Sequence, residues 1–168
     1  MTTYTTRFGS LADYDKGRVE PIADDVKHYV FSNCFEIANN SQPWEKVVFG
    51  KNQIYVMEVI RAEGVSPWYT CAHDEFVLNM DGDVEVHLID LDASQTVTDP
   101  EKNGAVLVQG KPRGKKMGWM RLKRGHQGML PKNTAYQIRS QKPCVLVLQT
   151  CLGDLSVQKW ADICQTAA

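Results

Sequence analysis

The strongest limit on the fold of this chain is a succession of short β-type runs between Gln53 and Gly153. Residues 53–64 are rich in branched and aromatic side chains and end in a glycine. Residues 118–153 are interrupted every few positions by glycine or proline. Many short strands with such punctuation are typical of a β-sandwich or a β-barrel. We therefore predict a single all-β domain.

The dipeptide Asp81-Gly82 stands between two apolar-rich runs of this region. Asp-Gly is the strongest short hairpin signal, so we predict a hairpin at this position. A long polar stretch with several glycines and a proline then covers residues 92–118. Such a stretch indicates an extended hairpin or a mobile loop on the rim of the barrel.

The two ends of the chain differ from this middle part. Residues 1–25 are poor in apolar groups, which predicts an N-terminal arm ahead of a domain over residues 26–168. Apolar and polar positions alternate in residues 26–31, as in a half-buried strand. At the other end, Asp154 is expected to cap a short C-terminal helix.

The composition limits the class of protein. Hydrophobic residues make up 43% and charged residues 23% of the 168 residues, a balance typical of a soluble globular domain. The net charge of -1 indicates neither a nucleic-acid-binding nor a membrane-surface protein. No stretch resembles a signal peptide or a membrane span, so we expect a cytoplasmic protein. The five cysteines include no C-x-x-C pair and are expected to be free thiols.

Two stretches match parts of the paired signature motifs of the cupin superfamily. Glu75 and Gly82 have the spacing of the E-(X)6-G that ends the first motif, G-(X)5-H-X-H-(X)3,4-E-(X)6-G. Gly125 and Pro131 have the spacing of the G-(X)5-P that opens the second motif, G-(X)5-P-X-G-(X)2-H-(X)3-N. The chain thus resembles the cupins, which implies a double-sheet jelly-roll barrel with an N-terminal arm and a short C-terminal helix.

The metal-ligand positions of the two motifs are mostly lost. Counted back from Glu75, the two histidines of the first motif fall at Tyr69 and Cys71, or one residue earlier, at Trp68 and Thr70. The histidine of the second motif falls at Tyr136. Only Glu75 remains of the four ligands. One carboxylate alone cannot hold Fe(II) against water, so we expect no metal in this chain.

A different ligand set is a weaker alternative. Cys71, His73 and Glu75 alternate, so on one strand they would point to the same side and could bind a metal in an unusual register. The simpler interpretation is a buried polar network in which His73 is hydrogen-bonded and Cys71 packs as an apolar group. Shared facing is a weak signal, so we favour the network.

The resemblance extends beyond the superfamily. Residues 7–20, 55–88, 124–131 and 148–166 resemble the small subunit of two-component, Fe(II)-dependent hydroquinone 1,2-dioxygenases. That resemblance implies a larger cupin partner that carries the iron, commonly in a heterotetramer. It implies ring opening of hydroquinone or a substituted hydroquinone by O2 to 4-hydroxymuconic semialdehyde. The missing ligands fit a subunit that keeps the fold and leaves the metal to its partner.

The residue roles that follow are hypotheses. Trp68 and Tyr69 are expected to line a pocket or the interface with the larger chain, or else to pack in the core. Tyr136 is expected to close the former metal cavity by a hydrogen bond to Glu75 or His73. No residue of this chain is assigned a catalytic role.

Two alternatives belong to other classes of protein. The chain could be a stand-alone metal-free cupin that binds a small ligand or regulates, or a self-sufficient metalloenzyme. The basic residues 111–124 indicate either a contact with an acidic partner face or an ordinary solvated edge.

Overall fold

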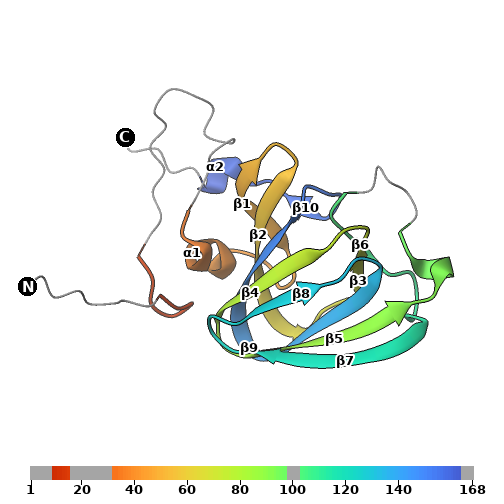
Figure 1. Ribbon diagram of the computed structural model, residues 1–168. Coiled ribbons are helices and arrows are strands. Elements are labelled where there is room, and N and C mark those ends of the chain that lie inside the picture. Colours follow the sequence, from red (N-terminus) through yellow and green to blue (C-terminus); the bar gives the residue numbers. More distant parts are fainter. Residues whose placement is uncertain (1–8, 16–31, 98–102, 164–168) are drawn as a thin grey trace, which may run out of the picture.

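Figure 1 shows the computed structural model of the chain, which describes residues 9–15, 32–97 and 103–163. Short helices accompany the strands: α1 (Cys34–Asn39), the 3-10 helix η2 (Ala93–Gln95) and α2 (Trp160–Ile163). The described strands are β1 (Lys46–Asn52), β2 (Tyr55–Val65), β3 (Tyr69–Cys71), β4 (Glu75–Asp81), β5 (Val84–Leu91), β6 (Ala105–Leu107), β7 (Gly114–Leu122), β8 (Gln127–Leu130), β9 (Thr134–Cys151) and β10 (Ser156–Val157).

The long strand β9 organises the barrel because it belongs to two sheet layers. Its second half lies between β2 and β4, which gives the strand order β10-β1-β2-β9-β4-β8. Its first half lies beside β3 and β5, which gives the order β6-β3-β9-β5-β7. The curled sheet is visible in Figure 1. This architecture confirms the predicted cupin-type double-sheet barrel.

The barrel interior is filled by alternate side chains of these strands. Its apolar part includes Ile60, Val77, Val86, Ile138 and Leu146, all of them buried. These residues come from β2, β4, β5 and β9, and the layers meet face to face as in other sheet sandwiches. Burial of this cluster therefore depends on the long-range pairing around β9.

The turn predicted at Asp81-Gly82 exists, but the predicted hairpin is wrong. β4 and β5 do not pair with each other; both pair antiparallel with β9, one after the other along the same side. The chain therefore bends at Gly82, whose φ is 73°, and continues in the same direction. The Asn79 side-chain amide donates to the Gly82 and Leu122 carbonyls at 2.7 and 2.9 Å and holds this bend.

The described parts of the long polar stretch, residues 92–97 and 103–118, are more ordered than a rim loop. They contain η2, the short strand β6 and the start of β7. β6 pairs with β3, and β7 pairs with β5 as one arm of the extended hairpin. The Lys142-Pro143 pair also does not end a strand, since β9 runs through it. A proline is tolerated there because the pairing of β9 with β2 is interrupted opposite it, between Ala62 and Gly64 of β2.

A second apolar cluster covers the outer face of the sheet. Helix α1 begins after Asn33, whose side chain accepts a 3.0 Å hydrogen bond from the Phe35 amide. Phe35 and Ile37 of α1 pack over Val47 and Val145. The helix was not predicted, because its six residues make fewer than two turns and show no repeating apolar pattern.

The ends of the chain give mixed outcomes. Of the predicted arm, the structure describes residues 9–15, where the Leu11 amide donates a 2.8 Å hydrogen bond to the Asp81 carboxylate. The strand expected at 26–31 lies outside the described residues. The C-terminal helix exists, but its predicted start at Asp154 is wrong. Asp154 lies in a turn that leads into β10, because Ser156 pairs with Lys46 there, and α2 begins only at Trp160.

Candidate functional site

The barrel encloses charged side chains as well as apolar ones. Lys46 at the start of β1 is 3% exposed, and Glu58 on β2 is 1% exposed. The Lys46 Nζ lies 4.0 Å from Oε2 of Glu58, while Ser156 donates a short hydrogen bond to the other oxygen, Oε1. Burial raises the pKa of Glu58, and the charge of Lys46 opposes this rise. This ion pair is the first element of the site.

A second carboxylate lies in the same interior. Glu75 at the start of β4 is 0% exposed, and the Thr150 hydroxyl of β9 donates a 2.6 Å hydrogen bond to its Oε1. Tyr136 is also buried, and its pKa lies well above the usual value because of burial and then the charge of Glu75. The structure thus places Tyr136 close to Glu75, while the hydrogen bond expected between them stays a prediction.

Two further predicted residues line this interior. The Tyr69 ring lies 5.6 Å from the Tyr136 ring and 4.7 Å from the Lys46 Nζ, measured to the ring centroid. Burial raises the pKa of Tyr69 to about 12. The buried Cys71 thiol donates to the Gly104 carbonyl at 3.2 Å, and burial and then Glu75 raise its pKa to about 12. Both side chains are neutral near pH 7.

The strand alternation that would align Cys71, His73 and Glu75 is interrupted. β3 ends at Cys71 and β4 begins at Glu75, with a bend between them. His73 lies in this bend, half-buried, and its Nδ1 donates to the Asp74 carbonyl oxygen at 2.8 Å. Within the described ranges, no three or more His, Cys, Asp or Glu side chains are grouped to hold a metal. The geometry therefore does not support the alternative ligand set.

The interior does not fit the iron site that the ligand positions of the cupin motifs would form. A ferrous site needs neutral imidazoles and carboxylates that converge on one point. Here the positions aligned with the motif histidines carry Tyr69, Cys71 and Tyr136, which are protonated near neutral pH. The ammonium of Lys46 also lies 5.9 Å from the centre of the Tyr136 ring, and a cation there repels a metal ion.

The remaining predicted residues lie away from this interior. Trp68 is half-buried just before β3, whereas its neighbour Tyr69 is inside the barrel. In the basic segment 111–124, several side chains have local partners. Arg121 binds Glu85 at 2.9 Å, and Arg124 binds Asp81 at 2.6 Å.

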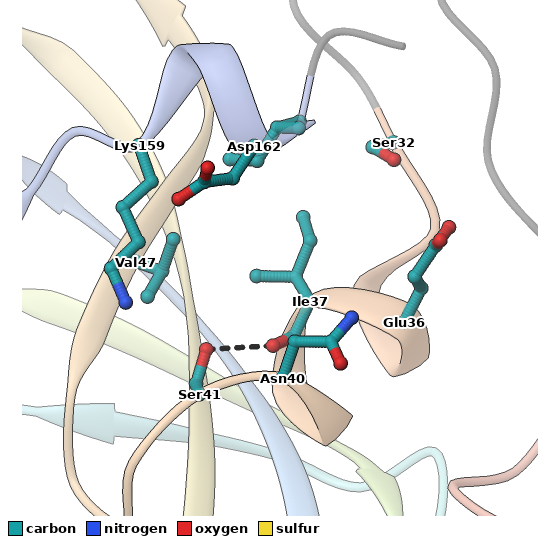
Figure 2. A pocket seen from close by; sticks show the side chains of 9 residues that line it. Ser32, Glu36, Ile37, Asn40, Ser41, Val47, Lys159 and Asp162 are labelled. Carbon is teal, nitrogen blue, oxygen red and sulfur yellow. Dashed lines mark hydrogen bonds between the residues drawn. The ribbon is translucent and has the colours of Figure 1, made fainter.

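Two hollows lie outside the barrel interior. Figure 2 shows one of about 250 Å³ between α1 and α2, with Val47 and Ile37 on its apolar side and Lys159 and Asp162 at its edge. The Ser41 hydroxyl donates a 2.6 Å hydrogen bond to the Ile37 carbonyl there (Figure 2). A wider groove of about 650 Å³ lies at the chain bend around Gly82. Neither hollow includes a residue of the interior charged cluster.

Solved structures decide the family. The chain is 51% identical to a chain of hydroquinone 1,2-dioxygenase from Sphingomonas sp. TTNP3 with 4-hydroxybenzoate bound. The match covers 99% of this chain and 100% of that one, and its TM-score is 0.88. It is 48% identical to a chain of hydroquinone 1,2-dioxygenase PnpCD in complex with Cd²⁺ and 4-hydroxybenzonitrile, with 99% of both chains covered and a TM-score of 0.87. This chain belongs to the hydroquinone 1,2-dioxygenase family.

Hydroquinone 1,2-dioxygenases also contain a longer chain of related fold. A chain of PnpCD in complex with Fe³⁺ is 15% identical to this one, with a TM-score of 0.59. That likeness covers 86% of this chain but 40% of the longer one, and it concerns the fold alone.

No model of a protein family and no curated protein matches the chain. In the described part, no helix has the length and apolar character needed to cross a membrane.

The sequence did not reveal the charged residues of the dioxygenase chain's interior. Glu58 stands in phase with Val56 and Ile60 on one strand, so its alternation placed it on the buried face. That signal was available. Thr150 likewise stands in phase with the buried Leu146 and Leu148 on β9. Lys46 carries no such signal, because a single charged residue at the start of an apolar run is usually exposed.

Proposed function

We propose that this chain is the small, metal-free subunit of a hydroquinone 1,2-dioxygenase. In this proposal a larger cupin chain binds Fe(II), and the two chains form a heterotetramer in the cytoplasm. The complex would cleave hydroquinone, or a substituted hydroquinone, with O2 to 4-hydroxymuconic semialdehyde. The isolated small chain would be inactive. The observation that carries the proposal is the likeness of about half the residues along the full chain to dioxygenase chains.

Two features of the interior support a metal-free role. The buried ammonium of Lys46 lies among the positions where the cupin motifs have metal ligands. The three side chains aligned with the motif histidines are neutral donors near pH 7. A subunit with this interior contributes the barrel and its surface to a complex rather than a redox metal. Of the two predicted aromatic contacts, Trp68 is the one with exposed surface for a partner.

The test is co-expression of this chain, tagged, with the larger chain that accompanies it. We expect the two to purify together and to consume O2 on addition of hydroquinone, while each chain alone shows little activity. Metal analysis of the separated chains should find iron only in the larger one. A larger chain that is fully active alone and never co-purifies with this one would disprove the subunit role. Such a result would favour a stand-alone binding or regulatory module.

A further inference from the structure

The barrel centre holds one ammonium and two carboxylates away from solvent. Lys46, Glu58 and Glu75 come from three different strands, and all are nearly inaccessible. Charged side chains are almost never buried to this degree unless they are paired, because loss of hydration costs several kcal/mol per ion, on the order of the gain from pairing. The three charges therefore act as one unit.

The ammonium is held by charge and by aromatic faces rather than by hydrogen bonds. Its distance of 4.0 Å from Oε2 of Glu58 is too long for a hydrogen bond. Among the described residues, the Lys46 Nζ has no hydrogen-bond partner. The rings of Tyr69 and Tyr136 lie 4.7 and 5.9 Å from it, within the range of cation–π attraction.

The two carboxylates repeat one arrangement. In each, a hydroxyl group fixes Oε1: Ser156 does so for Glu58 and Thr150 for Glu75. In each, Oε2 is buried and has no hydrogen-bond partner in the described part of the chain. The buried Tyr136 hydroxyl lies against Glu75, and Oε2 of Glu58 lies 4.0 Å from the Lys46 ammonium. Buried carboxylates normally have partners, so two carboxylates near one ammonium indicate that this space suits a cation.

We infer that the barrel centre is a cation site that the Lys46 ammonium fills from within the chain. When the Lys46 side chain is shortened, a divalent cation with a preference for oxygen ligands, such as Mn²⁺, takes its place between Glu58 and Glu75. Carboxylate and phenol oxygens suit Mn²⁺ or Mg²⁺ better than they suit softer metals. In the natural chain the tethered ammonium excludes such ions.

The test uses the full-length chain with Lys46→Ala, folded in the presence of MnCl2 and then freed of loose metal. Electron paramagnetic resonance should find about one bound Mn²⁺ per variant chain and none in the natural chain. The melting temperature of the variant should rise with Mn²⁺. Lys46→Ala/Glu75→Gln, which lacks one carboxylate, should lose at least tenfold in Mn²⁺ affinity. Lys159→Ala, which removes a surface lysine paired with Glu45, should bind none.

A folded Lys46→Ala chain that binds no Mn²⁺ would overturn the inference. If that variant does not fold, Lys46→Met keeps most of the side-chain volume and tests the same point. We expect Lys46→Met/Glu58→Gln to melt at a higher temperature than Lys46→Met, because the second change removes a carboxylate that has lost its cation. An equal or lower melting temperature would contradict the inference. These measurements use this chain alone, so they are independent of the subunit proposal.

Discussion

The Thr150 hydroxyl donates a 2.6 Å hydrogen bond to Oε1 of Glu75, and both side chains are buried inside the barrel. The two residues lie 75 positions apart in the sequence. Glu75 opens β4 and Thr150 lies near the end of β9, so this bond links the two strands on the interior side. It fixes one oxygen of a carboxylate that is surrounded by the barrel core.

Replacing Thr150 tests the value of this bond. Thr150→Val keeps the shape of the side chain but leaves Oε1 of Glu75 without its donor. We expect the free energy of unfolding to fall by about 1–3 kcal/mol, measured by urea denaturation. Thr150→Ser, which keeps the hydroxyl, should lose less than half of that amount. Equal stability of the two variants would show that the hydroxyl contributes little.

The raised pKa of Glu58 predicts a specific pH dependence. A buried carboxyl whose folded-state pKa is above its unfolded value favours folding at low pH, below the ordinary value of 4.5. That contribution is lost as the pH rises through the folded-state pKa. The groups facing Glu58 are Lys46, which lowers its pKa, Ser156, which also lowers it, and Glu75, which raises it.

We therefore expect Glu58→Gln to change the slope of stability with pH. Relative to this variant, the natural chain should lose unfolding free energy as the pH rises above the ordinary value of 4.5, as chemical denaturation at each pH would measure. Asp90→Asn, at an exposed carboxylate of β5, serves as the control and should change the slope less than Glu58→Gln does. Parallel curves for the natural chain and Glu58→Gln would contradict the prediction.

Gly82 at the bend between β4 and β5 is expected to tolerate no side chain. Its φ is 73°, and a Cβ atom there would overlap the Sγ of Cys144. Gly110 has a similar φ of 70° but open space around it, so Gly110→Ala isolates the backbone cost. We expect Gly110→Ala to cost about 1 kcal/mol and Gly82→Ala about 1–3 kcal/mol more in unfolding free energy.

A second substitution separates crowding from strain at this bend. In a Cys144→Ala background the sulfur is absent, so the extra cost of Gly82→Ala over Gly110→Ala should largely disappear. Double-mutant cycles by denaturant unfolding give this coupling directly. If the cost of Gly82→Ala is the same in both backgrounds, the close approach to Cys144 is not its cause.

Trp119 on β7 is expected to contribute to binding of the larger chain. Its side chain is 58% exposed, stacks on His87 with ring centroids 6.3 Å apart, and lies on a strand that pairs only with β5 among the described strands. Exposed tryptophan is typical of interface hot spots. Trp119→Ala should weaken the complex at least tenfold by surface plasmon resonance and leave the melting temperature of the isolated chain nearly unchanged.

Tyr55→Ala is the matched control, since Tyr55 is an equally exposed aromatic residue on the other layer. This variant should bind the larger chain as the natural chain does. Unchanged affinity of Trp119→Ala would place the interface elsewhere, with Trp68 the next residue to replace.

The sequence alone determined several of the strands and the family of this chain. Alternating apolar residues produce strands wherever they occur, because one face must be buried, and so β2, β4, β5 and the second part of β9 were predictable from short windows. Glu75 and Tyr136 could be located from motif spacing, since the barrel positions of a motif keep their register. The full-length similarity to hydroquinone 1,2-dioxygenase chains confirmed the family that four stretches of the sequence had indicated.

Only the tertiary structure decided which strands pair and which charges meet. The Asp81-Gly82 dipeptide specifies a sharp bend in any context, but whether the strands on either side pair with each other depends on β9, more than fifty residues later. Lys46, Glu58 and Glu75 likewise come together through three separate strand pairings. A local pattern records whether a side chain is apolar, whereas the partner of a buried charge is set by distant parts of the chain. That physical difference is why the fold could be predicted and the charged barrel centre could not.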